Sequence, residues 1–263
     1  MGILNLTPDS FYDGGKYRRE EQWLSQTRKM LEEGADIIDL GAVSTRPGAR
    51  PVSKELELVR LLVPLKKMVA EFPKAVFSID TCHAEVARQC VEAGAGMIND
   101  ISGGSFDEDM FPTIAELKVP YVLMHIHGTP QNMQQHPLSE NIVSIVRAFF
   151  AERVSALHEL GVKDIILDPG FGFGKTVESN YELLHKMAST RIDDLPLLAG
   201  VSRKSMISKV LNIKPSEALN GTTVANTLAL MGGANLLRVH DVKEARETID
   251  IVRYYRNFGP FPK

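Results

Sequence analysis

The hydrophobic positions of this 263-residue chain fall into eight short apolar runs, most of which stop at a polar or charged residue. Runs of this length, bounded by turn residues, are typical of buried strands in a parallel sheet. The pattern predicts eight strands, at Gly2–Leu6, Asp36–Gly41, Ala75–Asp80, Gly96–Asp100, Pro120–His125, Asp164–Asp168, Pro196–Ser202 and Asn235–His240.

Amphipathic segments lie between these runs and predict helices. They cover Arg18–Glu33, Lys54–Phe72, His83–Ala93, Asp107–Lys118, Ser139–Leu160, Asn180–Ser189, Ser216–Met231 and Val242–Phe258. Four of them end at a glycine that leads within a few residues into the next strand, at Gly34, Gly94, Gly161 and Gly233. Strict alternation of strand and helix predicts an α/β protein, a single (β/α)₈ TIM barrel over residues 1–263. The longest loops are expected after the first two strands, over residues 7–17 and 42–52.

Composition narrows the function classes. A formal net charge of -3 without a basic block argues against nucleic acid as the main partner. No apolar stretch reaches the roughly 20 residues that cross a bilayer, and the N-terminus lacks a cationic leader. Cys82 and Cys90 would lie roughly 12 Å apart on one helix, too far for a disulfide. We therefore expect a soluble cytoplasmic protein.

Acidic and amide side chains end three of the predicted strands. Asp80, Asn99 and Asp168 follow apolar runs, and strand C-termini meet at one mouth of a TIM barrel. A buried carboxylate needs hydrogen-bond donors. These three residues therefore suit a flat heterocycle with amino and ring N–H groups, although capping of the adjacent loops is an alternative role for each.

Cationic side chains are expected at the same rim. Arg46, Lys204, Arg238 and His240 come from different loops or strand ends, and the last two lie on the same side of one strand. Arginine contacts phosphate with two N–H groups, and histidine donates without a permanent charge. The set favours a phosphorylated or pyrophosphorylated substrate over the alternative of four unrelated surface cations.

Two local motifs resemble known signatures but do not match them. The segment 168–176 fails the nucleotide-loop pattern because Pro169 stands at the first glycine position, and its Gly-Phe alternation instead predicts a tight loop presenting Phe173 to a planar ligand. His125-Ile126-His127 has the H-x-H spacing of metal-dependent barrel hydrolases, but the later strand ends lack the additional ligands.

Taken together, these segments resemble dihydropteroate synthase over the whole chain. The matching strings are Met1–Phe11, Ser44–Gly48, Ser78–Thr81, Ile98–Gly104, Gly128–Pro130, Asp168–Lys175, Ser202–Ser205 and Arg238–Asp241. The sequence departs from the family pattern at Ala42 and Val43, where Gly and Glu are common. Members also usually carry an N-terminal extension over the barrel base, whereas this sequence starts directly at the first strand.

The resemblance implies condensation of 6-hydroxymethyl-7,8-dihydropterin pyrophosphate with p-aminobenzoate, giving 7,8-dihydropteroate and pyrophosphate in folate biosynthesis. It implies that the pterin is held by Asp80, Asn99, Met124, Asp168, Phe173 and Lys204. The pyrophosphate is expected to contact Arg46, Arg238 and His240, and Mg²⁺ is expected to bind Asn5. The expected p-aminobenzoate site consists of Phe11, Thr45, Pro47 and Ser202. Asp168, Lys204, Arg46, Arg238 and His240 are then the expected catalytic residues. A homodimer is also implied.

The chemistry of this reaction fits that residue set. The electron-rich dihydropterin delocalises a positive charge at the methylene carbon, and cations stabilise the departing pyrophosphate. An arylamine is already a nucleophile, so an SN1-like path is expected without an activating base. Two alternatives share the pocket: a catalytically silent pterin-binding paralog and a pterin-dependent methyltransferase. Neither needs a pyrophosphate site.

Overall fold

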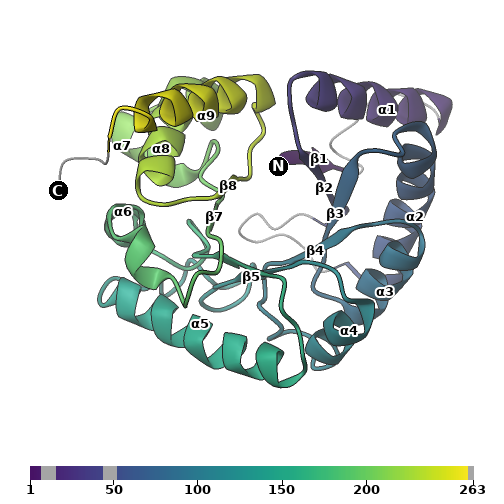
Figure 1. The fold of residues 1–263 in the computed structure, drawn as a ribbon, viewed down its shortest axis with the longest axis horizontal. Helices are drawn as coiled ribbons and strands as arrows, with labels where there is room; N and C mark the ends of the chain where they lie inside the picture. Colours follow the sequence, from purple (N-terminus) through teal and green to yellow (C-terminus); the bar gives the residue numbers. More distant parts are fainter. Residues whose placement is uncertain (7–15, 44–51, 260–263) are drawn as a thin grey trace.

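A computed structural model describes residues 1–6, 16–43 and 52–259 of the chain. The strands form an inner ring, and the helices surround it from α1 round to α9 (Figure 1). The strands are β1 (Gly2–Asn5), β2 (Ile37–Gly41), β3 (Val76–Asp80), β4 (Met97–Asp100), β5 (Tyr121–Met124), β6 (Ile165–Asp168), β7 (Leu198–Ala199) and β8 (Leu236–Leu237).

The strands follow one another in chain order and are parallel. β1 to β6 form one sheet, and β7 pairs with β8. Parallel bridges join these two parts at both seams, between Leu167 and Leu197 and between Gly2 and Val239. At the second seam the amide of Ile3 donates to the carbonyl of Val239 at 2.9 Å. The ring is therefore continued from β6 to β7 and from β8 to β1, which confirms the predicted (β/α)₈ barrel.

The helices agree with the prediction in number and order, with one addition. They are α1 (Lys16–Glu32), α2 (Lys54–Glu71), α3 (Ala84–Glu92), α4 (Met110–Leu117), α5 (Ile142–Glu159), α6 (Val177–His185), α7 (Ser205–Leu211), α8 (Leu219–Met231) and α9 (Val242–Arg256), with short 3₁₀ turns η2 (Met187–Thr190) and η3 (Pro215–Glu217). The sequence analysis missed α7, because a seven-residue segment is too short to show a helical period.

The predicted starts of α4, α5, α6 and α8 were each wrong by three residues, and two of them have clear local reasons. α5 begins at Ile142 and not at Ser139, because Asn141 adopts a left-handed backbone with φ 54°. α6 begins before Asn180, because the Thr176 hydroxyl accepts the amide of Ser179 and caps an earlier first turn. Most of the two long loops predicted after β1 and β2 lies outside the described residues.

The predicted glycine joints occur at the ends of four helices. Gly34, Gly94, Gly161 and Gly233 have φ between 84° and 107°, which L side chains rarely adopt. The backbone therefore turns immediately from helix to strand at the barrel end opposite the strand C-termini. Arg246 reinforces the first joint by donating to the carbonyl of Gly34 at 2.7 Å.

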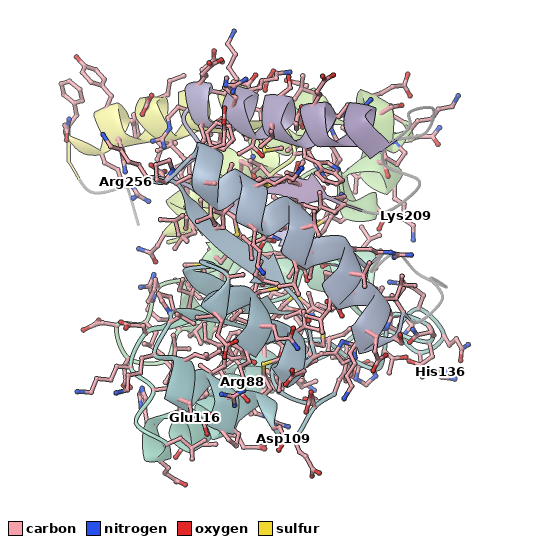
Figure 2. The ribbon with its side chains drawn as sticks, turned by 90° about the vertical axis from the view of Figure 1, so that its right-hand side faces the viewer. Arg88, Asp109, Glu116, His136, Lys209 and Arg256 are labelled. Atoms are coloured by element: carbon pink, nitrogen blue, oxygen red, sulfur yellow. The ribbon has the colours of Figure 1, made fainter. Side chains whose placement is uncertain are left out.

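The outer face of α3 and α4 carries charged side chains. Side chains project outward from α1 to α4 in Figure 2, where Arg88 of α3 and Glu116 of α4 form an ion pair at 2.7 Å. Among the described helices, none is long and apolar enough to span a membrane.

Alternation along the strands separates two environments. Ile38, Leu40 and their counterparts on other strands pack outward against the helices in the main core. A second apolar cluster fills the barrel interior below the mouth, formed by Met97, Val122, Ile166 and Leu198 with Met1, Ile37 and Leu236 around them. The polar residues at the strand ends therefore rest on a dry, packed floor.

Asp100, at the end of β4, organises the turn that follows. Its carboxylate accepts the amides of Ser102 and Gly104 at 2.7 and 2.8 Å and the hydroxyl of Tyr121 at 2.7 Å. Tyr121 and Asp100 are fully buried, so the carboxylate depends on these donors.

We predict that Tyr121→Phe lowers the free energy of unfolding by about 1–3 kcal/mol, because it removes one donor from a buried carboxylate while keeping the ring. Urea denaturation followed by circular dichroism measures the change. Tyr254→Phe is the control, since Tyr254 is 68% exposed. Equal effects of the two substitutions would contradict the prediction.

Candidate active site

The strand ends align in register at one end of the barrel. Asn5 pairs with Gly41, Gly41 with Asp80, and Asp80 with Asn99 across β1 to β4. Because side chains alternate along each strand, residues in one row face the same side of the sheet. The predicted acid and amide positions therefore lie at one level of the mouth.

Two glycines leave room between these side chains. A Cβ atom at Gly41 would lie 3.6 Å from Oδ2 of Asp80 and 3.7 Å from Oδ1 of Asn5. A Cβ atom at Gly200, just beyond β7, would lie 3.9 Å from both Oδ2 of Asp168 and Nζ of Lys204. The side chains of Asn5, Asp80, Asp168 and Lys204 thus converge around Gly41 and Gly200.

A guanidinium joins two carboxylates across the barrel. Arg238, just after β8, donates from Nε to Oδ2 of Asp39 and from Nη2 to Oδ2 of Asp80, both at 2.7 Å. Asn99 donates from Nδ2 to the same oxygen of Asp39 at 3.0 Å. Arg238 was expected on an anion, and here its partners are protein carboxylates.

Asp39 is a site residue that the sequence analysis missed. It lies in the middle of β2 and is fully buried. A single carboxylate inside the apolar run Ile37–Gly41 was the available signal, because such a group is stable only beside donors. Its donors, Asn99 and Arg238, come from 60 and 199 residues away in the chain.

Burial and neighbouring charges shift the protonation of these groups. Burial raises the pKa of Asp80 to about 7, with Arg238 opposing the shift and Asp39 adding to it. For Arg238, burial lowers the pKa, but the carboxylates of Asp39 and Asp80 outweigh it and raise the value. Arg238 therefore stays charged, whereas Asp80 is poised to exchange its proton near neutral pH.

Asp168 and Lys204 form the opposite side of the mouth. Oδ1 of Asp168 accepts the amide of Gly170 at 2.8 Å, and burial raises the pKa of this carboxyl against the opposing effect of Lys204. Lys204 donates to the carbonyl of Phe171, and its Nζ lies 4.6 Å from the ring centroid of Phe173. Burial lowers the pKa of Lys204 to about 8. The predicted association of Phe173 with the site is thus present.

The Gly-Phe loop has its own buried cation. Nζ of Lys175 donates to the carbonyls of His125, Gly170 and Phe173 at 3.3, 2.8 and 3.1 Å. Burial lowers the pKa of Lys175 to about 7. The sequence analysis considered this lysine only within a failed nucleotide motif, but its contacts hold the loop that carries Phe173.

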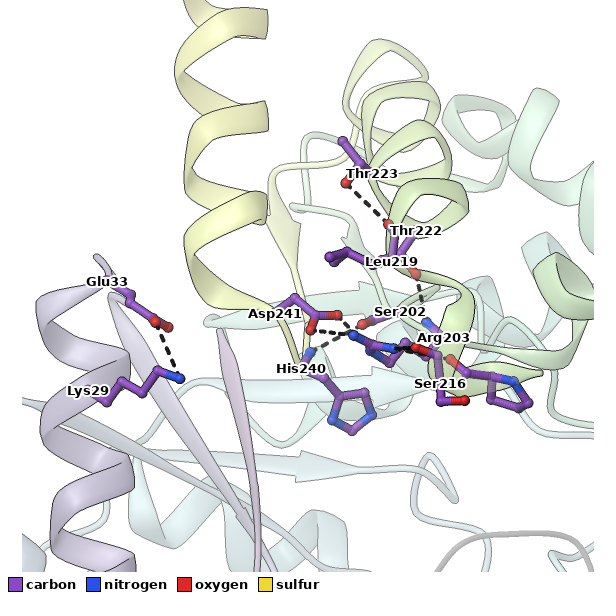
Figure 3. Close-up of polar contacts among 11 residues, drawn as sticks. Lys29, Glu33, Ser202, Arg203, Ser216, Leu219, Thr222, Thr223, His240 and Asp241 are labelled. Carbon is purple, nitrogen blue, oxygen red and sulfur yellow. Dashed lines mark hydrogen bonds and ion pairs between the residues drawn. The ribbon is translucent and has the colours of Figure 1, made fainter. Parts of the chain in front are cut away.

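The loops after β7 and β8 are joined by an ion pair (Figure 3). Arg203 donates from Nε and Nη2 to the carboxylate of Asp241, both at 2.9 Å, and from Nη1 to the carbonyl of Ser216 at 2.7 Å. The amide of His240 donates to the Ser202 hydroxyl at 3.2 Å. These bonds fix the backbone on either side of Lys204 and next to His240, whose side chain is exposed.

The structure brings together most of the predicted residues that it describes. Asp80, Asn99, Asp168, Lys204 and Arg238 surround the mouth, with Asn5 exposed at its edge. Phe11, Thr45, Arg46 and Pro47 lie outside the described residues.

Two further predicted residues have mainly structural contacts. Met124 ends β5 and is 2% exposed, beside the tight turn at Gly170. Ser202 is 6% exposed and its hydroxyl accepts the His240 amide. Its contact with p-aminobenzoate stays a prediction.

His125, the first residue of the H-x-H motif, packs against an aromatic ring. His125 is buried edge-on against Phe149, and burial lowers its pKa to about 3. Over the described part of the chain, no three His, Cys, Asp or Glu side chains are grouped as metal ligands.

Comparison with known proteins places this geometry in a family. Residues 1–240 match the family model described as pterin binding enzyme. The chain is 42% identical over 254 residues to dihydropteroate synthase of Escherichia coli, covering 96% of this chain and 89% of that one.

Solved structures agree. The chain superposes with a TM-score of 0.90 at 39% identity on Yersinia pestis dihydropteroate synthase with a sulfonamide drug, covering 97% of this chain and 93% of that one. For the Xanthomonas albilineans enzyme in complex with 7,8-dihydropteroate the TM-score is 0.85 at 35% identity, covering 97% and 92%. The chain therefore belongs to the dihydropteroate synthase family of pterin-binding enzymes.

Proposed function

We propose that the mouth of this barrel condenses 6-hydroxymethyl-7,8-dihydropterin pyrophosphate with p-aminobenzoate, releasing pyrophosphate and giving 7,8-dihydropteroate. The observation that carries the assignment of residues is the meeting of two carboxylates, the buried Asp168 and the half-buried Asp80, with two half-buried cations, Lys204 and Arg238. Acceptors suit the N–H groups of a pterin, and cations suit a pyrophosphate. The Xanthomonas albilineans relative binds 7,8-dihydropteroate, the product of this reaction.

The pterin would be held by complementary hydrogen bonds. Asp80 and Asp168 supply acceptors for its amino and ring N–H groups, and Lys204 supplies a donor. Asn99 gives its Nδ2 to Asp39, which leaves its Oδ1 as an acceptor for the ligand. Phe173, held beside Lys204, offers a flat apolar surface to the ring system.

The pyrophosphate would lie on the cationic side of the mouth. Arg238 and His240 follow β8 on one face, and Arg46 is expected to join them from outside the described residues. Asn5 fits a Mg²⁺ ligand, because its carboxamide oxygen lies at the open space over Gly41 and hard cations prefer oxygen donors. Mg²⁺, when bound, offsets the negative charge of the leaving group.

The charges favour an SN1-like path. Asp168 and Asp80 make the pterin side of the mouth negative, which stabilises a positive charge spreading from the methylene carbon into the dihydropterin. Arg238 stabilises the negative charge that grows on the pyrophosphate. The arylamine needs only to be positioned on the methylene carbon, since its nitrogen lone pair is already available.

We predict that Lys204→Met lowers pyrophosphate release in the presence of p-aminobenzoate by about 100-fold or more, because it removes the half-buried cation beside Asp168. The assay uses dihydropterin pyrophosphate and Mg²⁺, with and without p-aminobenzoate. Lys209→Met, exposed on α7, is the control and should retain full activity. Wild-type protein that binds the pterin but releases no pyrophosphate would instead be a silent paralog.

The same assay tests the path with substrate deuterated at the reacting methylene. A normal secondary isotope effect is expected, because the carbon becomes planar before the arylamine bonds to it. An effect near unity would contradict the SN1-like path while leaving the overall reaction intact.

We predict a bell-shaped pH dependence of kcat/KM for the pterin substrate. Burial raises the pKa of Asp80 to about 7 and Asp39, Glu57 and Asp100 favour its protonated form, against Arg238, so the acceptor is lost as the pH falls below 7. Burial lowers the pKa of Lys204 to about 8, so the cation is lost as the pH rises above 8. A kcat/KM that stays constant between about pH 6 and about pH 9 would contradict these assignments.

We also propose that the protein forms a homodimer through the outer surface of α8 and α9. These two helices pack side by side (Figure 1) and carry a group of exposed apolar side chains. The group comprises Val224, Leu228, Met231, Ile251, Tyr254, Tyr255 and Phe258. Exposed apolar side chains gathered on two neighbouring helices are typical of an interface with another protein.

Sedimentation velocity tests this surface. Ile251→Glu is expected to convert a wild-type dimer to a monomer, because a charge would be buried without a partner. Val59→Glu on α2 is the matched control, since Val59 and Ile251 are both 70% exposed. A monomeric wild-type protein, or dissociation by Val59→Glu alone, would contradict the proposal.

A further inference from the structure

Arg238 and the pterin compete for one acceptor. In the absence of ligand, Nη2 of Arg238 donates to Oδ2 of Asp80 at 2.7 Å. The proposed function requires Asp80 to accept N–H groups of the pterin and Arg238 to bind the pyrophosphate. A pterin edge that offers two N–H groups uses both oxygens of Asp80, so in that pose the guanidinium leaves Oδ2 when substrate binds.

The exchange is chemically balanced. A guanidinium presents adjacent N–H donors to a carboxylate, and the amino and ring N–H edge of a pterin presents the same arrangement. Asp80 therefore keeps donors before and after binding, as a carboxylate with a side chain only 12% exposed requires. The displaced guanidinium, in contrast, needs another anion.

Asp39 is placed to supply that anion. It accepts Nε of Arg238 at 2.7 Å, and its carboxylate is fully buried. On β2 it precedes Gly41, the neighbour of Asp80, by two residues, so it lies on the same face but deeper in the barrel. A substrate at the mouth reaches Asp80 before it reaches Asp39.

Asp39 also has an unused acceptor. Its Oδ2 takes the bonds from Arg238 and Asn99, whereas its Oδ1 is buried with no partner among the described residues. Nη2 of Arg238 already lies 2.7 Å from Oδ2 of Asp39. An arginine that releases Asp80 can therefore donate to the free Oδ1 as well, without any new group entering the site.

We propose that Asp39 is a positioning residue that retains Nε of Arg238 throughout the reaction cycle, while the rest of the guanidinium moves from Asp80 to the pyrophosphate. The proposal rests on the proposed function. Arg238 thereby occupies the pterin's acceptor in the free protein and contacts the leaving group in the complex. Asp39 itself contacts neither substrate.

The consequence is measurable in a variant that keeps shape and loses charge. In Asp39→Asn, a pterin that displaces Arg238 from Asp80 leaves a buried guanidinium without a carboxylate. We expect the affinity for 6-hydroxymethylpterin, which lacks pyrophosphate, to fall by about tenfold or more. Inorganic pyrophosphate with Mg²⁺ gives the guanidinium another anion and should restore most of that affinity.

Isothermal titration of 6-hydroxymethylpterin, with and without pyrophosphate and Mg²⁺, measures both effects. Asp36→Asn is the matched control: Asp36 lies just before β2 and pairs with Arg246 at 2.6 Å, but it is 79% exposed at the other end of the barrel. The control should bind as the wild type does. Equal weakening of Asp39→Asn with and without pyrophosphate would reduce Asp39 to a structural role, and unchanged binding would also overturn the proposal.

A second measurement follows the wild-type protein, and a variant serves only to assign the signal. With ¹⁵N-labelled arginine, assigned by comparison with Arg238→Lys, the Nε–H signal of Arg238 should remain protected from exchange in the free protein and with pterin and pyrophosphate bound. Loss of that protection on binding would overturn the proposal. Failure of dihydropteroate synthesis in the wild type would overturn the proposed function, whereas these binding readouts would still report on Asp39.

Discussion

The guanidinium of Arg238 connects strands from the start and the end of the chain. Its two carboxylate partners, Asp39 and Asp80, lie 199 and 158 residues away along the sequence. These contacts exist only because β8 closes the ring against β1. The same closure brings Asp168 and Lys204 to the other side of the mouth, so the electrostatics of the site depend on this one topological feature.

Burial gives these charges their chemical properties. In water each carboxylate would be fully ionised and each ammonium fully protonated at neutral pH. In the mouth, burial brings the pKa of Asp80 to about 7 and that of Lys204 to about 8. The apolar floor of Met97, Val122, Ile166 and Leu198 keeps water from beneath the polar layer. The charged side chains of the mouth therefore interact strongly with the charges that would form when the bond between the methylene carbon and the pyrophosphate breaks.

A second level of organisation supports these groups. Lys175 gathers three carbonyl oxygens of the loops after β5 and β6, and the Arg203–Asp241 pair joins the loops after β7 and β8. Neither contact needs a substrate to explain it. Both contacts fix the backbone that carries Phe173, Lys204 and His240. Ordinary hydrogen bonds of the fold therefore position the side chains of the site.

The sequence by itself determined the alternation of strands and helices, the glycine joints and the acids and cations at the strand ends. These are local properties: apolar runs, positive-φ turns and the point at which each run stops. It left α7 undetected, because seven residues are too few to show a helical period. It gave no partner for Asp39 and no role for Lys175, because a buried charge is stabilised by hydrogen-bonding groups that other strands and loops deliver. Only the tertiary structure decided that Arg238 lies between Asp39 and Asp80, since closure of the barrel brings β2, β3 and β8 to one mouth.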